Sequence, residues 1–160
     1  MDRAAVSADP APAERRVAVR ITKDALRRIR SGHPWLFDRS IVSLSHDGAP
    51  GDLAVIFDDK REFVGVGLLD PASPIRVRLL HVGKPRSINT AFWQEKIDAA
   101  VSLRAPLTHG HEAVGPTTGY RLINGENDGF GGLIVDRDHT VLVVKGYSAA
   151  WLPHLPVLVD

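Results

Sequence analysis

Four short apolar segments follow one another closely in the first half of the chain, and turn residues bound each of them. They are Ile41–Leu44, Leu53–Phe57, Phe63–Leu69 and Ile75–His81. Their β-branched residues, with Asp, Gly and Pro in the intervening turns, are typical of closely spaced β-strands. Short, regularly spaced strands predict a compact β-barrel. Gly65 and Gly67 inside one strand predict a bend or a close approach of neighbouring backbone.

One further strand and one short helix are expected before these four segments. Apolar residues occupy every second position over Arg16–Ile21, which predicts a strand with one buried face. Thr22 is a suitable N-cap for a short helix that places Leu26 and Ile29 on one face. The string Ser31–Pro34 ends this helix, because its glycine accepts a left-handed conformation and its proline cannot continue the helix.

The second half of the chain has a different pattern. An amphipathic helix is predicted over Thr90–Arg104, ended by Pro106 and followed by a polar loop over Leu107–Thr118. The apolar residues at helical spacing are Trp93, Ile97, Ala100 and Val101. Three strands of a small sheet are predicted over Tyr120–Asn124, Gly132–Asp136 and Val141–Tyr147. The fold class is therefore α+β, mostly β: a barrel followed by a helix packed on a short sheet.

Composition excludes several classes of protein. The chain has 160 residues, of which 44% are hydrophobic, and its apolar runs fall far short of the roughly 20 residues of a membrane span. The first residues have no apolar segment typical of a secretory signal. The absence of cysteine excludes disulfides, thiolate metal sites and cysteine nucleophiles. A soluble cytoplasmic protein that does not associate with membranes is expected.

Positive charge is concentrated near the start of the chain although the net charge is only +1. Eight basic and two acidic residues lie between Arg15 and Arg39, whereas six acidic and two basic residues lie between Asp47 and Asp70. Such asymmetry indicates contact with a polyanion, and the alternative is a solvated helix face. The residues that could contact RNA are Lys23, Arg27, Arg28, Arg30, His33, Arg76 and Arg78. The neighbouring Trp35 and Phe37 are expected in the barrel core.

Two other groups of polar residues invite a chemical interpretation. His109 and His111 could suggest a metal, but two histidines on a loop without a third ligand favour a plain loop, so no metal site is predicted. Glu126 and Asp128 are formally a candidate acid/base pair. Turn chemistry alone also explains the acidic residues and glycines of this segment.

Three strings, in order along the chain, resemble the bacterial large-subunit rRNA cytosine-C5 methyltransferases. Arg30–Phe37 is similar to the Gly-His-Pro-Trp-(Ile/Val)-Phe element of the family's PUA domain. Gly51–Val55, Phe63–Gly67 and Pro71–Arg78 are similar to the strands that follow it. Tyr120–Arg137 is similar to a distinctive run in the family's central α+β domain, with Gly131 in place of the usual proline, which loosens the turn.

The resemblance implies a domain organisation and a partner. It implies a PUA-like RNA-binding domain over 15–85 and a central α+β domain over 86–148. The Ala- and Pro-rich composition of 1–14 predicts a disordered leader, and the two prolines of 149–160 predict a linker. Family members continue into a Rossmann-type domain that binds S-adenosylmethionine and supplies a catalytic cysteine. The chain is therefore expected to dock RNA, in particular large-subunit rRNA, and to be inactive alone, with no cofactor and no catalytic residue of its own.

The resemblance also implies a docking role for the segment 124–132. Its site residues are Arg121, Asn124, Glu126 and Asp128, which are expected to meet the substrate or the methyltransferase domain. As exposed turn residues, Glu126 and Asp128 are expected to contribute little to stability. Two alternatives stay open: a stand-alone RNA-binding or protein-interaction adaptor, and an inert product of gene truncation. A second copy of the chain is a further possible partner.

Overall fold

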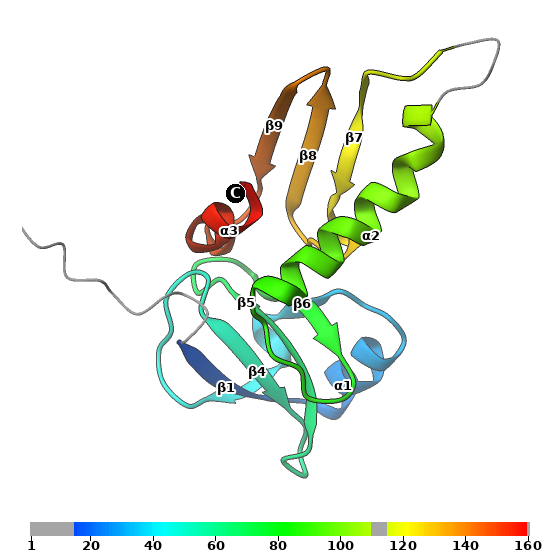
Figure 1. The fold of residues 1–160 in the computed structure, drawn as a ribbon. Helices are drawn as coiled ribbons and strands as arrows, with labels where there is room; N and C mark the ends of the chain where they lie inside the picture. Colours follow the sequence, from blue (N-terminus) through cyan, green and yellow to red (C-terminus); the bar gives the residue numbers. More distant parts are fainter. Residues whose placement is uncertain (1–14, 110–114, 160) are drawn as a thin grey trace, which may run out of the picture.

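The computed structural model describes residues 15–109 and 115–159, which form a curled sheet and a small sheet joined by a long helix (Figure 1). The expected disordered leader and His111 lie outside the described residues.

The curled sheet contains every strand predicted for the barrel. Its strands are β1 (Arg16–Ile21), β2 (Trp35–Phe37), β3 (Ile41–Leu44), β4 (Leu53–Phe57), β5 (Phe63–Leu69) and β6 (Ile75–Val82), in the order β2-β6-β5-β4-β1-β3. Strands β1 and β4 are parallel, and the other neighbours are antiparallel. The short helix α1 (Lys23–Arg30) begins at Thr22, whose hydroxyl accepts a hydrogen bond from the Ala25 N–H at 3.2 Å, as predicted. Strand β2 was not predicted, because only its middle residue, Leu36, is fully buried.

The second half of the chain forms the predicted small sheet, which confirms the α+β fold class. Its elements are helix α2 (Thr90–His109), strand β7 (Gly119–Asn124), the 3₁₀ turn η3 (Gly125–Asp128), and strands β8 (Leu133–Asp138) and β9 (Val141–Gly146). The three strands are antiparallel in the order β7-β8-β9. The 3₁₀ turn η4 (Ala149–His154) and helix α3 (Leu155–Val159) follow them.

The prediction that Pro106 ends the long helix is wrong, since α2 continues to His109. A proline inside a helix removes one N–H donor and crowds the preceding turn. The bond that Pro106 cannot donate is the one to the Ser102 carbonyl. In the last turn the Thr108 hydroxyl donates to the Ala105 carbonyl at 3.0 Å, and His109 Nδ1 lies 2.7 Å from the same oxygen. The predicted loop is shorter accordingly.

The segment that follows β9, expected to be a linker, is built into the core. Ala150, Trp151 and His154 are buried, and the indole N–H of Trp151 donates to the Gly131 carbonyl at 2.8 Å. His154 Nε2 donates to the carbonyl of Gly51, at 2.7 Å, in the loop before β4. The segment therefore connects the small sheet to the curled sheet.

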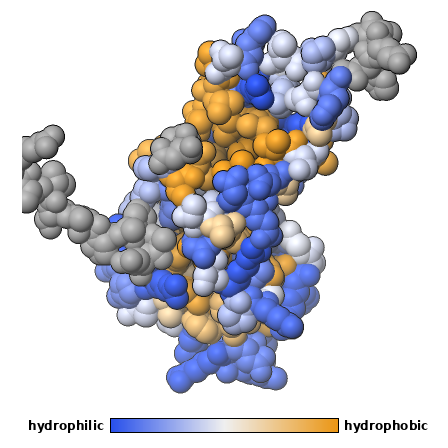
Figure 2. Space-filling model, in the orientation of Figure 1, coloured by the Kyte–Doolittle hydropathy of each residue, from blue (hydrophilic) through white to orange (hydrophobic). Residues whose placement is uncertain are grey.

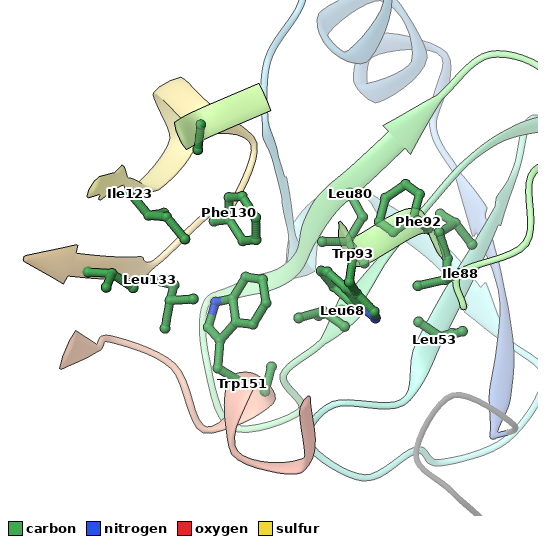
Figure 3. Packing of buried hydrophobic residues seen from close by; sticks show 14 residues of the cluster. Leu53, Leu68, Leu80, Ile88, Phe92, Trp93, Ile123, Phe130, Leu133 and Trp151 are labelled. Carbon is green, nitrogen blue, oxygen red and sulfur yellow. The ribbon is translucent and has the colours of Figure 1, made fainter. Parts of the chain in front are cut away.

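Two hydrophobic clusters lie on opposite faces of the curled sheet. One fills the concave side and includes Val17, Ile29 and Leu36. The other lies between the convex side and the small sheet, where Trp93, Phe130 and Trp151 meet at its centre (Figure 3). Its members from the curled sheet are Leu53, Val66, Leu68 and Leu80. Strands β4, β5 and β6 are thus buried on both faces, which explains why their sequences are nearly continuous apolar runs.

The two glycines of β5 lie where the neighbouring strand approaches most closely. A Cβ at Gly65 would lie 2.5 Å from the His81 carbonyl oxygen, and one at Gly67 would lie 2.4 Å from the Arg78 carbonyl oxygen. The register between β5 and β6 also shifts between Val66 and Gly67. The predicted close approach of backbone is confirmed.

An apolar surface covers much of the small-sheet half of the molecule (Figure 2). Strand β9 is a sheet edge, and its apolar side chains are exposed by up to 58% at Val141. Other exposed apolar residues are Leu142, Val143, Val144, Leu152, Val101 and Leu103. Over residues 15–109 and 115–159, no helix has both the length and the apolar character needed to cross a membrane.

Candidate nucleic-acid interface

Helix α1 exposes the basic side chains predicted to contact RNA. The side chain of Lys23 is 84% exposed and that of Arg27 is 79% exposed, while Arg28 and Arg30 are also exposed. Asp24 pairs with Arg27 and with Arg28, whose Nε lies 2.9 Å from the Asp24 carboxylate. Exposed pairs of this kind are weak, so these cations remain available to phosphate groups. The helix buries Ala25 and Ile29 and directs its basic residues to solvent.

A cluster of three rings lies directly after α1. The His33 ring centroid is 5.9 Å from that of Trp35 and 6.0 Å from that of Phe37. His33 Nδ1 lies 3.1 Å from the Trp35 carbonyl oxygen and 3.3 Å from the Trp35 backbone nitrogen, and a bond to either of them orients the imidazole. The expectation that Trp35 and Phe37 are barrel core is wrong: both are half-buried, because the two-residue period of β2 turns only Leu36 inward. Partly exposed rings beside a basic helix can stack on unpaired bases.

Arg76 and Arg78, two residues apart on β6, differ in exposure. Arg76 is half-buried and lines a hollow with Asp38 and Asp47. Arg78 is only 5% exposed, because the small sheet covers this part of β6, and it lies 3.7 Å from the Asp70 carboxylate. The burial of Arg78 is incompatible with a role as an open phosphate contact.

Glu126 joins the small sheet to the curled sheet. Its Oε1 accepts a hydrogen bond of 2.9 Å from the indole N–H of Trp35, 91 residues away in sequence. The expectation that Glu126 is an exposed turn residue is wrong, since it is half-buried at the junction. The indole of Trp35 thus lies between the ring cluster after α1 and the turn η3.

Asp128 is held by a charge pair inside the small-sheet half. Arg104 donates to both of its oxygens, at 2.9 and 2.6 Å, and the Asn124 N–H donates to Oδ2 at 2.6 Å. The Asp128 side chain is only 5% exposed. Burial alone would raise its pKa, but these hydrogen bonds and the charge of Arg104 outweigh burial and lower the pKa. Asp128 therefore stays ionised and structural, which excludes it as one half of an acid/base pair with Glu126.

We expect Asp128→Ala to destabilise the protein by about 2 kcal/mol at pH 7, because three charge-assisted hydrogen bonds are lost. Since the folded pKa is lowered, this contribution is complete above the unfolded value of about 3.9 and is lost as the pH falls through the folded value. Urea unfolding at pH 7 and at progressively lower pH should therefore show the gap between variant and wild type closing. Asp138→Ala, at an exposed carboxylate on β8, is the control and should change stability by less than about 0.5 kcal/mol. A gap that stays constant with pH would contradict the structural role.

The other two residues of the predicted docking segment differ in position. Arg121 is exposed on β7 and pairs with Asp136, Nε to Oδ1, at 2.8 Å. Asn124 is half-buried at the end of β7, beside η3. Phe130, in the middle of the segment, is fully buried. Much of the segment 124–132 therefore contacts the curled sheet of the same chain. Nowhere in the described parts of the chain do three or more His, Asp or Glu side chains gather as metal ligands would.

Sequence reasoning missed two residues of this region. Trp35 was assigned to the core because Trp35, Leu36 and Phe37 are all apolar, so no polar/apolar alternation marks Leu36 as the one buried residue. Tyr147 follows β9, is 67% exposed and lines a cavity together with residues of η3 and β8. No local sequence pattern predicts that Tyr147 lies near these two elements. Its position depends on the packing of the two sheets, which the sequence pattern does not specify.

Comparison with known proteins agrees with this architecture. Residues 19–81 match the family of the PUA-like domain. A ribosomal RNA large subunit methyltransferase of Deinococcus radiodurans is 47% identical over 146 residues, which are 91% of this chain and 36% of the relative. Ribosomal RNA large subunit methyltransferase I of Alteromonas mediterranea is 32% identical over 128 residues, which are 80% of this chain and 31% of the relative. The chain contains a PUA-like domain and is homologous to large-subunit rRNA methyltransferases, of which it spans about a third.

Two solved structures share the fold at 20% sequence identity. A candidate SAM-dependent methyltransferase from Streptococcus mutans superimposes with a TM-score of 0.74 over 89% of this chain and 36% of its own. A candidate methyltransferase in complex with SAH gives a TM-score of 0.75 over 89% of this chain and 35% of its own. Both likenesses include the curled sheet and extend well beyond it, since the PUA-like match alone covers only residues 19–81.

Proposed function

We propose that this chain is the RNA-docking, N-terminal part of an S-adenosylmethionine-dependent large-subunit rRNA methyltransferase of the cytosine-C5 type. The observation that carries the proposal is the exposed basic face of α1 next to the half-buried rings of His33, Trp35 and Phe37 on a PUA-like sheet. Lysine and arginine attract the phosphate backbone, and rings at the end of the basic helix suit unpaired bases. Both features lie on one region of the molecule.

The methyl-transfer chemistry is assigned to the part of the relatives that this chain does not span. Asp128 is committed to Arg104, and Glu126 is committed to the indole of Trp35. We expect the cofactor and the catalytic nucleophile to be supplied by a methyltransferase domain, and this chain to hold the rRNA against it. The chain's own role is binding and orientation of the substrate.

An adaptor that contacts protein is the second candidate, and the apolar surface around β9 favours it. An edge strand with exposed apolar side chains is a template for pairing with another chain. The methyltransferase domain and a second copy of this chain are the two partners we propose for it. Contact through β9 leaves the basic face of α1 free, so RNA docking and protein contact are compatible.

The RNA proposal predicts binding that depends steeply on salt. We expect the chain to bind a structured large-subunit rRNA fragment, with an affinity that falls as salt rises because phosphate contacts release counterions. Up to four cations of α1 predict a slope of log affinity against log salt of about −2 to −4. Fluorescence anisotropy over a salt series measures the slope. No binding at low salt, or a slope near zero, would contradict the proposal.

A further inference from the structure

A cavity of about 450 Å³ lies at the junction of the two sheets, below the ring cluster. Pockets of this size accommodate small organic ligands or single nucleotides. The curled sheet and the small sheet both line it, so it exists only where the two halves of the chain meet. The lining residues that matter for its chemistry are Trp35, Arg78, Asn124, Glu126, Asn127 and Tyr147.

Arg78 places a buried guanidinium at the cavity, and not all of its N–H donors have acceptors within the parts of the protein that the structure describes. A guanidinium has five N–H donors. Among the described residues, it donates one hydrogen bond, from Nη1 to the Ile75 carbonyl at 3.2 Å. Nε is buried against Gly132 and is closed to a ligand. Arg78 lines the cavity, so its remaining terminal N–H groups are the donors that it can offer to an acceptor there.

Glycines keep the backbone close to these polar groups. Gly132 has a φ of +76°, and a Cβ there would lie 2.8 Å from Arg78 Nε. A Cβ at Gly131 would lie 3.5 Å from both Arg78 Cβ and Glu126 Oε1. The contact at Gly131 is at an ordinary van der Waals distance, whereas a side chain at Gly132 would crowd Arg78. This gives Gly132 a reason beyond turn flexibility.

The charges of the cavity favour a neutral ligand over a phosphate group. Burial lowers the pKa of Arg78, while the negative charges of Asp70 and Glu126 act in the opposite direction. Two carboxylates close to one guanidinium leave little net positive charge for an anion. They suit instead a planar group that carries acceptors for the guanidinium and donors for the free oxygen of Glu126. Trp35 and the exposed ring of Tyr147 provide aromatic surface for such a group.

We propose that this cavity binds an unpaired nucleobase of the RNA, with guanine as the best match. Guanine presents O6 and N7 as acceptors, which pair with arginine, and N1–H and N2–H as donors, which a carboxylate accepts. Asn124 and Asn127 can bond to either kind of group. The inference rests on the proposed RNA binding, because Trp35 belongs both to the cavity and to the ring cluster after α1.

The test titrates the whole chain separately with GMP, AMP, CMP, UMP and inorganic phosphate. The readout is the indole N–H signal of Trp35 in a two-dimensional ¹H–¹⁵N NMR spectrum, since the indoles of Trp93 and Trp151 are buried elsewhere. We expect GMP to shift this signal saturably in the millimolar range, at least about fivefold more tightly than the other nucleotides. Phosphate should leave it in place. The same signal should respond to the RNA pentamer UUGUU and less to UUUUU.

Matched variants locate the bound base. Tyr147→Ala should weaken GMP binding about fivefold or more, because a stacking ring is lost, whereas Tyr120→Ala, at the only other tyrosine, should not. Glu126→Gln keeps an acceptor for Trp35 and should abolish the preference for GMP over AMP. No shift with GMP, an equal shift with phosphate, or equal binding by Tyr147→Ala and wild type would each overturn the cavity proposal. If salt-dependent RNA binding persists in that case, the proposed function stands without the cavity; if GMP binds but rRNA does not, the proposed function fails instead.

Discussion

Trp151→Ala is expected to destabilise the protein by about 3 to 5 kcal/mol, a large part of the stability of a domain of this size. Trp151 is 1% exposed, and its ring centroid lies 5.8 Å from that of Trp93 and 6.0 Å from that of Phe130. Truncation leaves a cavity between the sheets and also removes the bond to the Gly131 carbonyl. Urea unfolding followed by circular dichroism measures the loss.

The neighbouring residue provides the control for this prediction. Leu152 lies in the same 3₁₀ turn but is 65% exposed, so Leu152→Ala should change the free energy of unfolding by no more than about 0.5 kcal/mol. If the two variants lose equal stability, the buried side chain of Trp151 contributes no more than the exposed one of Leu152, and only the backbone of the turn matters. A loss of less than about 1 kcal/mol in Trp151→Ala would show that the segment after β9 is a linker after all.

Gly67→Ala is expected to cost about 3 kcal/mol or more, because the added methyl group meets backbone rather than a flexible side chain. It would lie 2.4 Å from the Arg78 carbonyl oxygen and 2.5 Å from Val77 Cγ1. Strand β6 lies between β5 and β2 in the curled sheet and cannot move away without breaking its pairing with β2. The same methyl group at Gly119 meets only Asp138 Oδ1, at 3.8 Å, so Gly119→Ala is the matched control. Thermal unfolding of both variants decides the matter, and similar melting temperatures would contradict the proposed close approach.

Much of the fold follows from local sequence pattern. Every strand of the curled sheet except β2, the N-cap at Thr22 and the strands of the small sheet were predicted, because each depends on residues close in sequence. The errors arise where packing between distant segments decides. Pro106 lies inside α2, where local propensity predicts an end, and the residues after β9 become core because Trp151 packs against Trp93 and Phe130.

The candidate site was predictable only in part, for the same reason. The basic residues of α1 are exposed as the charge pattern indicates, since a short helix with two buried positions must direct the others to solvent. The acidic residues of η3 were predicted to be exposed turn residues. In the structure Glu126 bonds to Trp35, 91 residues away in sequence, and Asp128 bonds to Arg104, 24 residues away. The burial of Arg78 likewise depends on a second sheet covering β6. Pairings across such separations leave no periodic signal in one sequence.

The salt dependence of RNA binding by a charge-reversed α1 tests the central claim most directly. We predict that Arg27→Glu combined with Arg28→Glu weakens binding to the rRNA fragment about tenfold or more at low salt and reduces the salt slope by about 1.5 to 2. Arg137→Glu combined with Lys145→Glu makes the same change in charge on exposed residues of β8 and β9, far from α1 (Figure 1), and should leave the slope nearly unchanged. An unaltered slope in the α1 variant, or an equal fall in both variants, would remove this helix from the RNA interface.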